Sequence, residues 1–325
     1  MYKPFFNLTR NPFEITPDPA FLFPTKRHNE ALAALYYGVR QHKGLVVLTG
    51  EVGTGKTLLL RCLLQLFKQS NDVAYAYLFN SRLSPTEFLQ YILSKFGLPA
   101  SGKNKCELLL DLGHFVISRG LQELTTVLIV DEAQHLSEDL LEEVRLLTDL
   151  ETTSEKLFQI LLVGQPELDQ KLDTLGLRQL KQRIALRSHL EPLDPNETKE
   201  YVERRLQIAG ANSHANTLFP SPTIAAVYHH SRGVPRLINT ICENALVTAY
   251  AKQMSTVTPD IIQSIANDFR LDVVKPPETE RGQEINEADI QQAAKTLLAF
   301  YAALQKPVAR DTELRSPITG RARQA

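Results

Sequence analysis

The segment GEVGTGKT, at residues 50–57, constrains the fold of this chain more than any other feature of the sequence. It matches the pattern G-x-x-x-x-G-K-[ST] in full, and it lies between an apolar strand-like run and a helix-like run, as the pattern requires. Glycines at positions 53 and 55 let the backbone turn so that successive N–H groups face phosphate oxygens, and the next helix adds its positive end. We therefore predict a nucleotide-binding loop made of Gly50, Glu51, Val52, Gly53, Thr54, Gly55, Lys56, Thr57 and Leu58.

Within this loop, Lys56 is expected to reach the β- and γ-phosphates, and Thr57 to offer its hydroxyl to Mg²⁺. A second motif, VLIVDEAQHL at residues 127–136, supplies carboxylates at the end of an apolar run. That position places Asp131 at the carboxyl edge of a sheet, where it can hold Mg²⁺ directly or through water. Glu132 can polarise the attacking water as a general base. A solvated pair of acids is the alternative, but the adjacent loop favours ATP hydrolysis with ATP and Mg²⁺ as cofactors.

The order of predicted elements indicates an α/β fold: a P-loop NTPase of the AAA+ type, with a three-layer parallel sheet core and a small all-helical lid. Apolar runs at 44–50, 72–80, 126–131, 157–164 and 187–193 predict strands that alternate with helices. After Pro192 only helices are predicted, at 195–209, 221–231, 234–252 and 258–269. A DEAQ-box helicase needs a second sheet domain, for which this chain has no room, so Gln134 and His135 are expected to be strand-exit residues.

These shifts in pattern divide the chain into three predicted parts. Residues 1–191 form the nucleotide-binding core with an N-terminal arm, and residues 192–270 form the helical lid. Residues 271–325 form a linker, one helix near 286–305 and a polar tail that is expected to be disordered. That helix carries a narrow apolar stripe, spaced either for a partner or for docking on the chain's own lid: Ile290, Ala294, Leu297, Tyr301 and Leu304.

Three further positions fit roles that AAA+ proteins need. Gln165, at the end of the fourth strand, could place its amide between the carboxylates and the γ-phosphate, the "sensor 1" role, or simply cap the next helix. Arg236, in RGVPRLIN, is suited to reach the γ-phosphate from the lid, the "sensor 2" role. Arg183, with Arg178 and then Arg187 as alternatives, is the candidate for an arginine that enters the next subunit's site, although surface ion pairing would also explain it.

Composition narrows the location and the partners. The net charge is −1, which does not indicate a globally basic nucleic-acid binder. No signal peptide and no membrane-length apolar run are recognised, so we expect a cytoplasmic protein that reaches the inner membrane only through a partner. The cysteines at 62, 106 and 242 are few and far apart, which supports neither a disulfide framework nor a zinc site.

The quoted motifs, together with NPFEITPDPAFLFPTKRHNEAL, VDEAQHLSEDLLEEVRLLTDLET, QILLVGQPEL and LRQLKQRI, resemble the AAA+ ATPases of the general secretion pathway protein A (ExeA) type. The same family includes ATPases of pilus-biogenesis and exosortase loci. The resemblance covers residues 1–269 and implies a ring or partial-ring homo-oligomer that serves an envelope or secretion apparatus. It also suggests that the arm around Asn11–Phe13 and His28 helps to form the adenine pocket, although the arm could simply brace the core.

Secretion-type members are expected to continue into a transmembrane helix and a periplasmic peptidoglycan-binding region, which this sequence lacks. Direct cell-wall binding is therefore not expected of this chain. Three functions follow as hypotheses. The favoured one is an assembly ATPase whose nucleotide state controls oligomerisation. The alternative is a DNA-associated switch of the transposition-target or replication-loading type, which a winged-helix module would have supported. A nucleotide-binding scaffold without hydrolysis is disfavoured because every hydrolytic residue is present.

Overall fold

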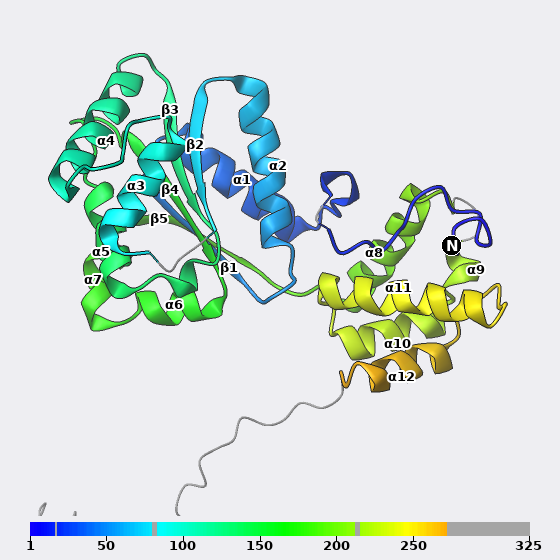
Figure 1. Cartoon of the computed structure of the whole chain (residues 1–325). Helices are drawn as coiled ribbons and strands as arrows, with labels where there is room; N and C mark the ends of the chain where they lie inside the picture. Colours follow the sequence, from blue (N-terminus) through cyan, green and yellow to red (C-terminus); the bar gives the residue numbers. More distant parts are fainter. Residues whose placement is uncertain (17, 80–82, 212–214, 272–325) are drawn as a thin grey trace, which may run out of the picture. The chain divides into compact units, whose positions relative to one another are not determined.

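The computed structural model describes residues 1–16, 18–79, 83–211 and 215–271 (Figure 1). All of them belong to one compact unit, Met1–Asp272. The helix predicted near 286–305, its apolar stripe and the polar tail lie outside the described residues. Within the described residues, no helix is both long enough and apolar enough to cross a membrane.

A five-stranded parallel sheet forms the centre of the core. Its strands are β1 (Leu45–Gly50), β2 (Val73–Leu78), β3 (Thr125–Val130), β4 (Phe158–Gly164) and β5 (Ile184–Leu190), in the order β2-β3-β4-β1-β5. Strands β1, β3 and β4 are buried throughout, as central parallel strands are. The predicted α/β fold is confirmed, but β5 begins at Ile184 rather than at Arg187. Its half-exposed edge position explains the difference, because apolar and polar residues alternate there and weaken the strand signal.

Helices cover both faces of the sheet, as Figure 1 shows. One face packs against α1 (Lys26–Arg40) and α2 (Lys56–Ser70) through alternate strand residues such as Val46 and Leu48. The opposite face, with Leu45 and Val47, packs against α3 (Pro85–Lys95), α4 (Lys105–Gly120) and α5 (Glu138–Leu147). The period-2 alternation of the buried strands thus produces the three predicted layers.

Local signals fix most helix ends. Ser84 and Asn104 begin α3 and α4 with capping boxes to Glu87 and Glu107. Helix α5 ends at Leu147, and Glu151 beyond it pairs with Lys156 across a turn. The short elements α6 (Pro166–Leu172), α7 (Arg178–Gln182), η1 (Pro19–Phe21), η2 (Ala133–His135) and η3 (Leu175–Leu177) were not predicted, because they are too brief to show periodicity.

The lid is helical, as predicted. It consists of α8 (Pro195–Ile208), α9 (Ala215–Leu218), α10 (Ser221–Ser231), α11 (Pro235–Ala251) and α12 (Pro259–Asp268), which share one hydrophobic cluster. The N-terminal arm joins this cluster: Tyr2, Phe6, Leu8 and Phe13 are buried in it, and the Thr9 amide donates to the Ala209 carbonyl at 2.8 Å. The predicted division groups the arm with the core, within residues 1–191. The aromatic side chains of the arm instead complete the core of the lid.

Candidate nucleotide site

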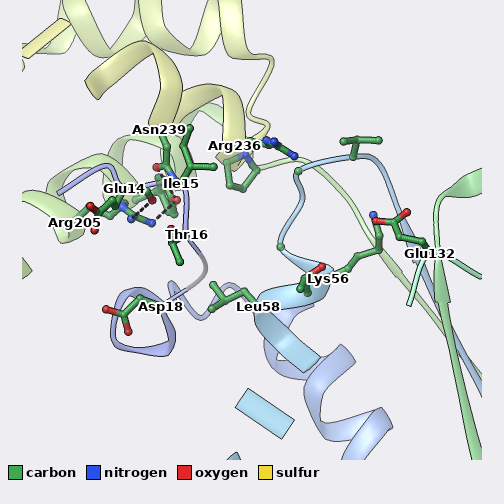
Figure 2. A pocket seen from close by; sticks show the side chains of 16 residues that line it. Glu14, Ile15, Thr16, Asp18, Lys56, Leu58, Glu132, Arg205, Arg236 and Asn239 are labelled. Carbon is green, nitrogen blue, oxygen red and sulfur yellow. Dashed lines mark hydrogen bonds between the residues drawn. The ribbon is translucent and has the colours of Figure 1, made fainter. Parts of the chain in front are cut away.

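A pocket of about 410 Å³ lies where the glycine-rich loop, the arm and the lid meet (Figure 2). This volume is within the range of small-molecule sites. Its lining comes from all three parts: Glu14, Ile15, Thr16 and Asp18 of the arm; Val52, Gly53, Gly55, Lys56, Thr57, Leu58 and Glu132 of the core; and Tyr201, Arg205, Pro235, Arg236 and Asn239 of the lid.

The loop has the backbone geometry that its glycines predict. Gly53 and Gly55 have φ of +85° and +104°, in the region that favours glycine. A side chain at Gly53 would also approach Arg236 Cβ to 2.7 Å. Lys56, only 5% exposed, folds onto the loop and donates to the carbonyls of Gly50 and Glu51 at 2.6 and 2.9 Å. Burial lowers the pKa of Lys56, although the nearby carboxylates of Glu132 and Asp131 oppose the shift.

His28 contacts the backbone of the glycine-rich loop. Its Nε2 lies 3.0 Å from the Thr54 carbonyl, and its Nδ1 lies 2.7 Å from the Thr25 hydroxyl. A carbonyl can only accept, so Nε2 carries the proton and Nδ1 accepts from Thr25. Burial lowers the pKa of His28 and keeps the ring neutral in this arrangement. The resemblance suggests that Asn11–Phe13 and His28 help to form the adenine pocket, and this stays a prediction. In the structure His28 contacts the Thr54 carbonyl of the loop, and Phe13 is buried against Phe219 in the lid.

Asp131 and Thr57 meet at the end of β3. The Thr57 hydroxyl donates to Asp131 Oδ2 at 3.2 Å, and the Tyr77 hydroxyl donates to the same oxygen at 2.7 Å. The other carboxylate oxygen accepts the Glu132 amide at 3.0 Å. Burial, together with the charge and hydrogen bond of Asp131, raises the pKa of Tyr77, so this phenol stays a donor. Tyr77 was missed in the sequence because only the pairing of β2 with β3 brings it to Asp131.

Glu132 is held by two amides. Its Oε2 accepts from Gln134 Nε2 at 2.7 Å and from Gln165 Nε2 at 3.1 Å, and the Gln165 backbone N–H donates to Gln134 Oε1 at 3.1 Å. Burial alone would raise the pKa of Glu132. The two amide donors and the positive charge of Lys56 outweigh burial and lower it. The Gln165 amide thus lies beside Glu132, and its γ-phosphate contact stays a prediction. Gln134 is a buried partner of Glu132 rather than a simple strand-exit residue.

Arg236 approaches the loop from the lid, as Figure 2 shows. Its backbone N–H donates to the Gly53 carbonyl at 3.2 Å, so the start of α11 is bonded directly to the loop. The preceding turn depends on Gly233, whose φ is +74° and whose Cβ position would collide with the Leu193 carbonyl oxygen. The residues RGVPR therefore bring this part of the lid to the loop.

Comparison with known proteins supplies the family. The sequence matches the AAA domain family over residues 39–172. Over 254 residues it is 44% identical to general secretion pathway protein A of Aeromonas hydrophila, which covers 78% of this chain. The chain is a relative of general secretion pathway protein A with an AAA domain. It spans 45% of the length of that relative.

Solved structures show the same fold at low identity. The ORC2 protein of Aeropyrum pernix, in its ADPNP-ADP complexes, has a TM-score of 0.58 and 18% identity, and the match covers 80% of this chain and 71% of that one. Cdc6p of Pyrobaculum aerophilum has a TM-score of 0.57 and 18% identity, with 77% and 70% covered. The described residues therefore have the fold of the P-loop AAA+ ATPases.

The donor groups of this site fit a nucleotide with a divalent cation. The loop amides and Lys56 form a cradle for phosphate oxygens, while the Thr57 hydroxyl and the Asp131 carboxylate present hard oxygen donors side by side, as Mg²⁺ prefers. A bound Mg²⁺ would neutralise phosphate charge there. The ionised Glu132 carboxylate can accept a proton from water, and its two amide donors fix where that acceptor lies.

Each candidate trans arginine has a different environment. Arg183 lies 2.6 Å from Asp149 Oδ1, and Arg187 lies 3.0 Å from Asp169 Oδ1. Arg178 is exposed and forms no ion pair within the described residues. Arg183 directly precedes β5, at the amino end of the sheet, whereas the loop follows the carboxyl end of β1. Leu45 pairs with Ile184 five residues before Gly50, a rise of roughly 17 Å. Arg183 is therefore remote from the phosphate cradle of its own chain.

Proposed function

We propose that this chain binds and hydrolyses ATP with Mg²⁺ and uses the nucleotide state to control its own oligomerisation, in the service of an envelope, secretion, pilus or polysaccharide-export apparatus. In this proposal Lys56 holds the phosphates, Thr57 and Asp131 hold Mg²⁺, and Glu132 is the general base. Gln165 and Arg236 sense the γ-phosphate. The supporting observation is the single pocket-lining set in which the loop, Glu132 and Arg236 come together.

The positions of Glu132 and Lys56 suggest how ATP would be hydrolysed. Glu132 accepts a proton as water attacks the γ-phosphorus, and the bond from this phosphorus to the β–γ bridging oxygen breaks, so ADP and phosphate leave. Lys56 stabilises the charge that develops on the phosphate oxygens. Lys56 must first leave the carbonyls of Gly50 and Glu51, which it occupies in this structure. Nucleotide binding thus exchanges two loop bonds of Lys56 for bonds to phosphate.

The lid supplies a route from nucleotide to assembly. Arg236 is bonded to Gly53 through its backbone and lines the pocket, so γ-phosphate loss changes the contacts of α11. A surface next to the lid or to Arg183 could then gain or lose a neighbouring subunit. The identity to general secretion pathway protein A supports service to a secretion or related envelope apparatus, from the cytoplasmic side and through a protein partner.

The test measures nucleotide binding, phosphate release and the mass of the oligomer. Lys56→Ala should lose nucleotide binding, whereas Glu132→Gln should bind ATP normally and lose at least ~100-fold of phosphate release. Light scattering of the parent should report larger species with a non-hydrolysable ATP analogue than with ADP. Near-parental turnover of Glu132→Gln would refute its role as base, and equal mass in both nucleotides would refute nucleotide-controlled assembly.

DNA binding is the competing outcome. The parent should show no ATP-dependent affinity for duplex DNA at physiological salt, measured by fluorescence anisotropy, because the chain is not globally basic. ATP-dependent binding that falls steeply with salt would favour the DNA-associated switch instead.

A further inference from the structure

Asn239 has a donor group that the proposed phosphate chemistry does not use. It lies on α11, three residues after Arg236, and lines the same pocket. Its side chain is 7% exposed. Within the described residues its amide nitrogen makes no hydrogen bond, whereas its amide oxygen does. Because Asn239 lines the pocket, this amide donor is available to an acceptor on a ligand bound there.

The orientation of this amide is fixed by a chain of hydrogen bonds. Arg205 Nη1 donates to the Tyr201 hydroxyl at 2.8 Å, and that hydroxyl lies 3.0 Å from Asn239 Oδ1. A guanidinium can only donate, so the phenol accepts from Arg205 and its own proton needs another acceptor. Asn239 Oδ1 is that acceptor. The NH₂ group of Asn239 is therefore directed away from Tyr201.

Arg205 is itself immobilised. It is 5% exposed, it donates to the Pro12 and Glu14 carbonyls at 2.5 and 3.3 Å, and its guanidinium lies 4.6 Å from the centre of the Phe21 ring. Burial raises the pKa of Tyr201 although the charge of Arg205 opposes the shift, so the phenol remains a donor. The arm thus holds Arg205, the first group in the series of hydrogen bonds that orients the Asn239 amide.

The position of Asn239 in the pocket indicates which part of a bound nucleotide its amide would contact. The phosphates belong at the loop, near Lys56 and Arg236, and the arm residues Glu14 and Ile15 line the side of the pocket away from Lys56 (Figure 2). Asn239 follows Arg236 by roughly 4.5 Å along the helix axis and lies toward Ile15 and Glu14 (Figure 2). Ile15 and Leu58 add apolar surface of the kind that packs against a planar base.

We propose that Asn239 is a specificity residue that donates its amide N–H to a ring nitrogen of the adenine base. This inference rests on the proposed ATP site and adds a contact to the base. Purine ring nitrogens are acceptors without a proton, so they complement a donor that Tyr201 prevents from turning into an acceptor.

The experiment is a double-mutant cycle between Asn239 and single atoms of the nucleotide. Competition against a fluorescent ATP analogue gives the affinities of ATP and of 1-deaza-, 3-deaza- and 7-deaza-ATP, each of which has C–H in place of one ring nitrogen. In the parent, one deaza analogue should bind roughly tenfold more weakly than ATP. In Asn239→Asp, which keeps an oxygen toward Tyr201 but replaces the donor by an acceptor, that difference should vanish or reverse.

Two variants make the cycle specific. Asn244→Asp places the same charge change on α11, at a residue that does not line the pocket and whose amide donates to the Thr240 carbonyl, and it should keep the parental difference. Tyr201→Phe removes the hydroxyl that fixes the amide, and it should reduce the difference without adding charge.

Each outcome decides between the proposals. A parent that does not bind ATP would overturn the proposed function and this inference with it. A parent that binds ATP, but whose three deaza differences are the same in Asn239→Asp, would overturn this inference alone. Coupling only to 2′-deoxy-ATP or 3′-deoxy-ATP, and to none of the deaza analogues, would assign the donor to ribose and would also overturn it.

Discussion

Gln134 restrains the carboxylate on which hydrolysis would depend. Its amide donates to Glu132 and accepts the Gln165 backbone N–H, so one buried side chain connects the two candidate catalytic groups. Glu132 itself has φ of +54°, a region that non-glycine residues seldom occupy. We infer that Gln134 is a positioning residue, because it contacts the acid and does not line the pocket.

Gln134→Leu should therefore lower kcat for ATP roughly tenfold and leave KM nearly unchanged. Loss of a donor to the ionised carboxylate also moves the pKa of Glu132 upward. The base must be deprotonated, so the acid limb of the pH–rate profile should shift to higher pH. Stopped assays across pH 4–8 would measure both effects. Gln182→Leu, an exposed change on α7, is the control, and an unmoved acid limb in Gln134→Leu would contradict the role.

Tyr77 plays a comparable part for Asp131. In Tyr77→Phe, Asp131 Oδ2 loses its 2.7 Å donor and gains freedom to rotate. Groups that orient a metal ligand commonly contribute tenfold or more in metal affinity. The Mg²⁺ concentration for half-maximal hydrolysis should rise roughly tenfold, while metal-free nucleotide binding stays unchanged. Tyr75→Phe, two residues earlier on β2, is the matched control, and equal Mg²⁺ requirements in both variants would exclude this role for Tyr77.

Among the elements, the arm is the one whose packing the sequence did not predict. Phe13 is fully buried in the lid cluster, edge-on to Phe219 at 5.8 Å between ring centres. Phe13→Ala should cost about 3–5 kcal/mol of the free energy of unfolding. Thermal unfolding followed by circular dichroism would show a lower Tm. Phe79→Ala, at a side chain that is 70% exposed, should leave Tm unchanged. Equal Tm values for the two variants would show that the arm is not part of the lid.

Site residues in contiguous motifs could be predicted from the sequence, whereas residues that depend on tertiary contacts could not. Residues 50–57, Asp131 and Glu132 lie in contiguous motifs at strand ends, and their mutual position follows from parallel strands alone. Tyr77, Gln134 and the Tyr201–Asn239 pair could not be found this way, because each depends on which strands are neighbours or on how a distant arginine is held. The packing of the arm could not be predicted for the same reason. Its aromatic residues show no periodicity, and they are buried only because the hydrophobic cluster of the lid surrounds them.

The lining of the pocket joins the core, the lid and the arm. Arg236 connects α11 to Gly53, and Arg205 connects α8 to the carbonyls of the arm. A nucleotide that bonds to the loop and to Asn239 would contact two of these parts at once. Assembly controlled by nucleotide then needs one more contact, an arginine from a neighbouring subunit.

We predict that Arg183 provides this contact in trans. It lies at the amino end of β5, remote from its own cradle, and its 2.6 Å ion pair with Asp149 must open when a neighbour's phosphate is offered. Arg183→Ala should bind ATP normally and hydrolyse it slowly, whereas Lys56→Ala should be inactive because its own site is empty. Mixed together, the two variants form interfaces in which an intact loop meets an intact Arg183, so phosphate release should return.

The same mixing with Arg178→Ala and Arg187→Ala tests the exposed arginine and the one paired with Asp169. Recovery with Arg178→Ala alone would transfer the role to Arg178. Co-assembled mixtures without recovery would exclude a trans arginine at all three positions.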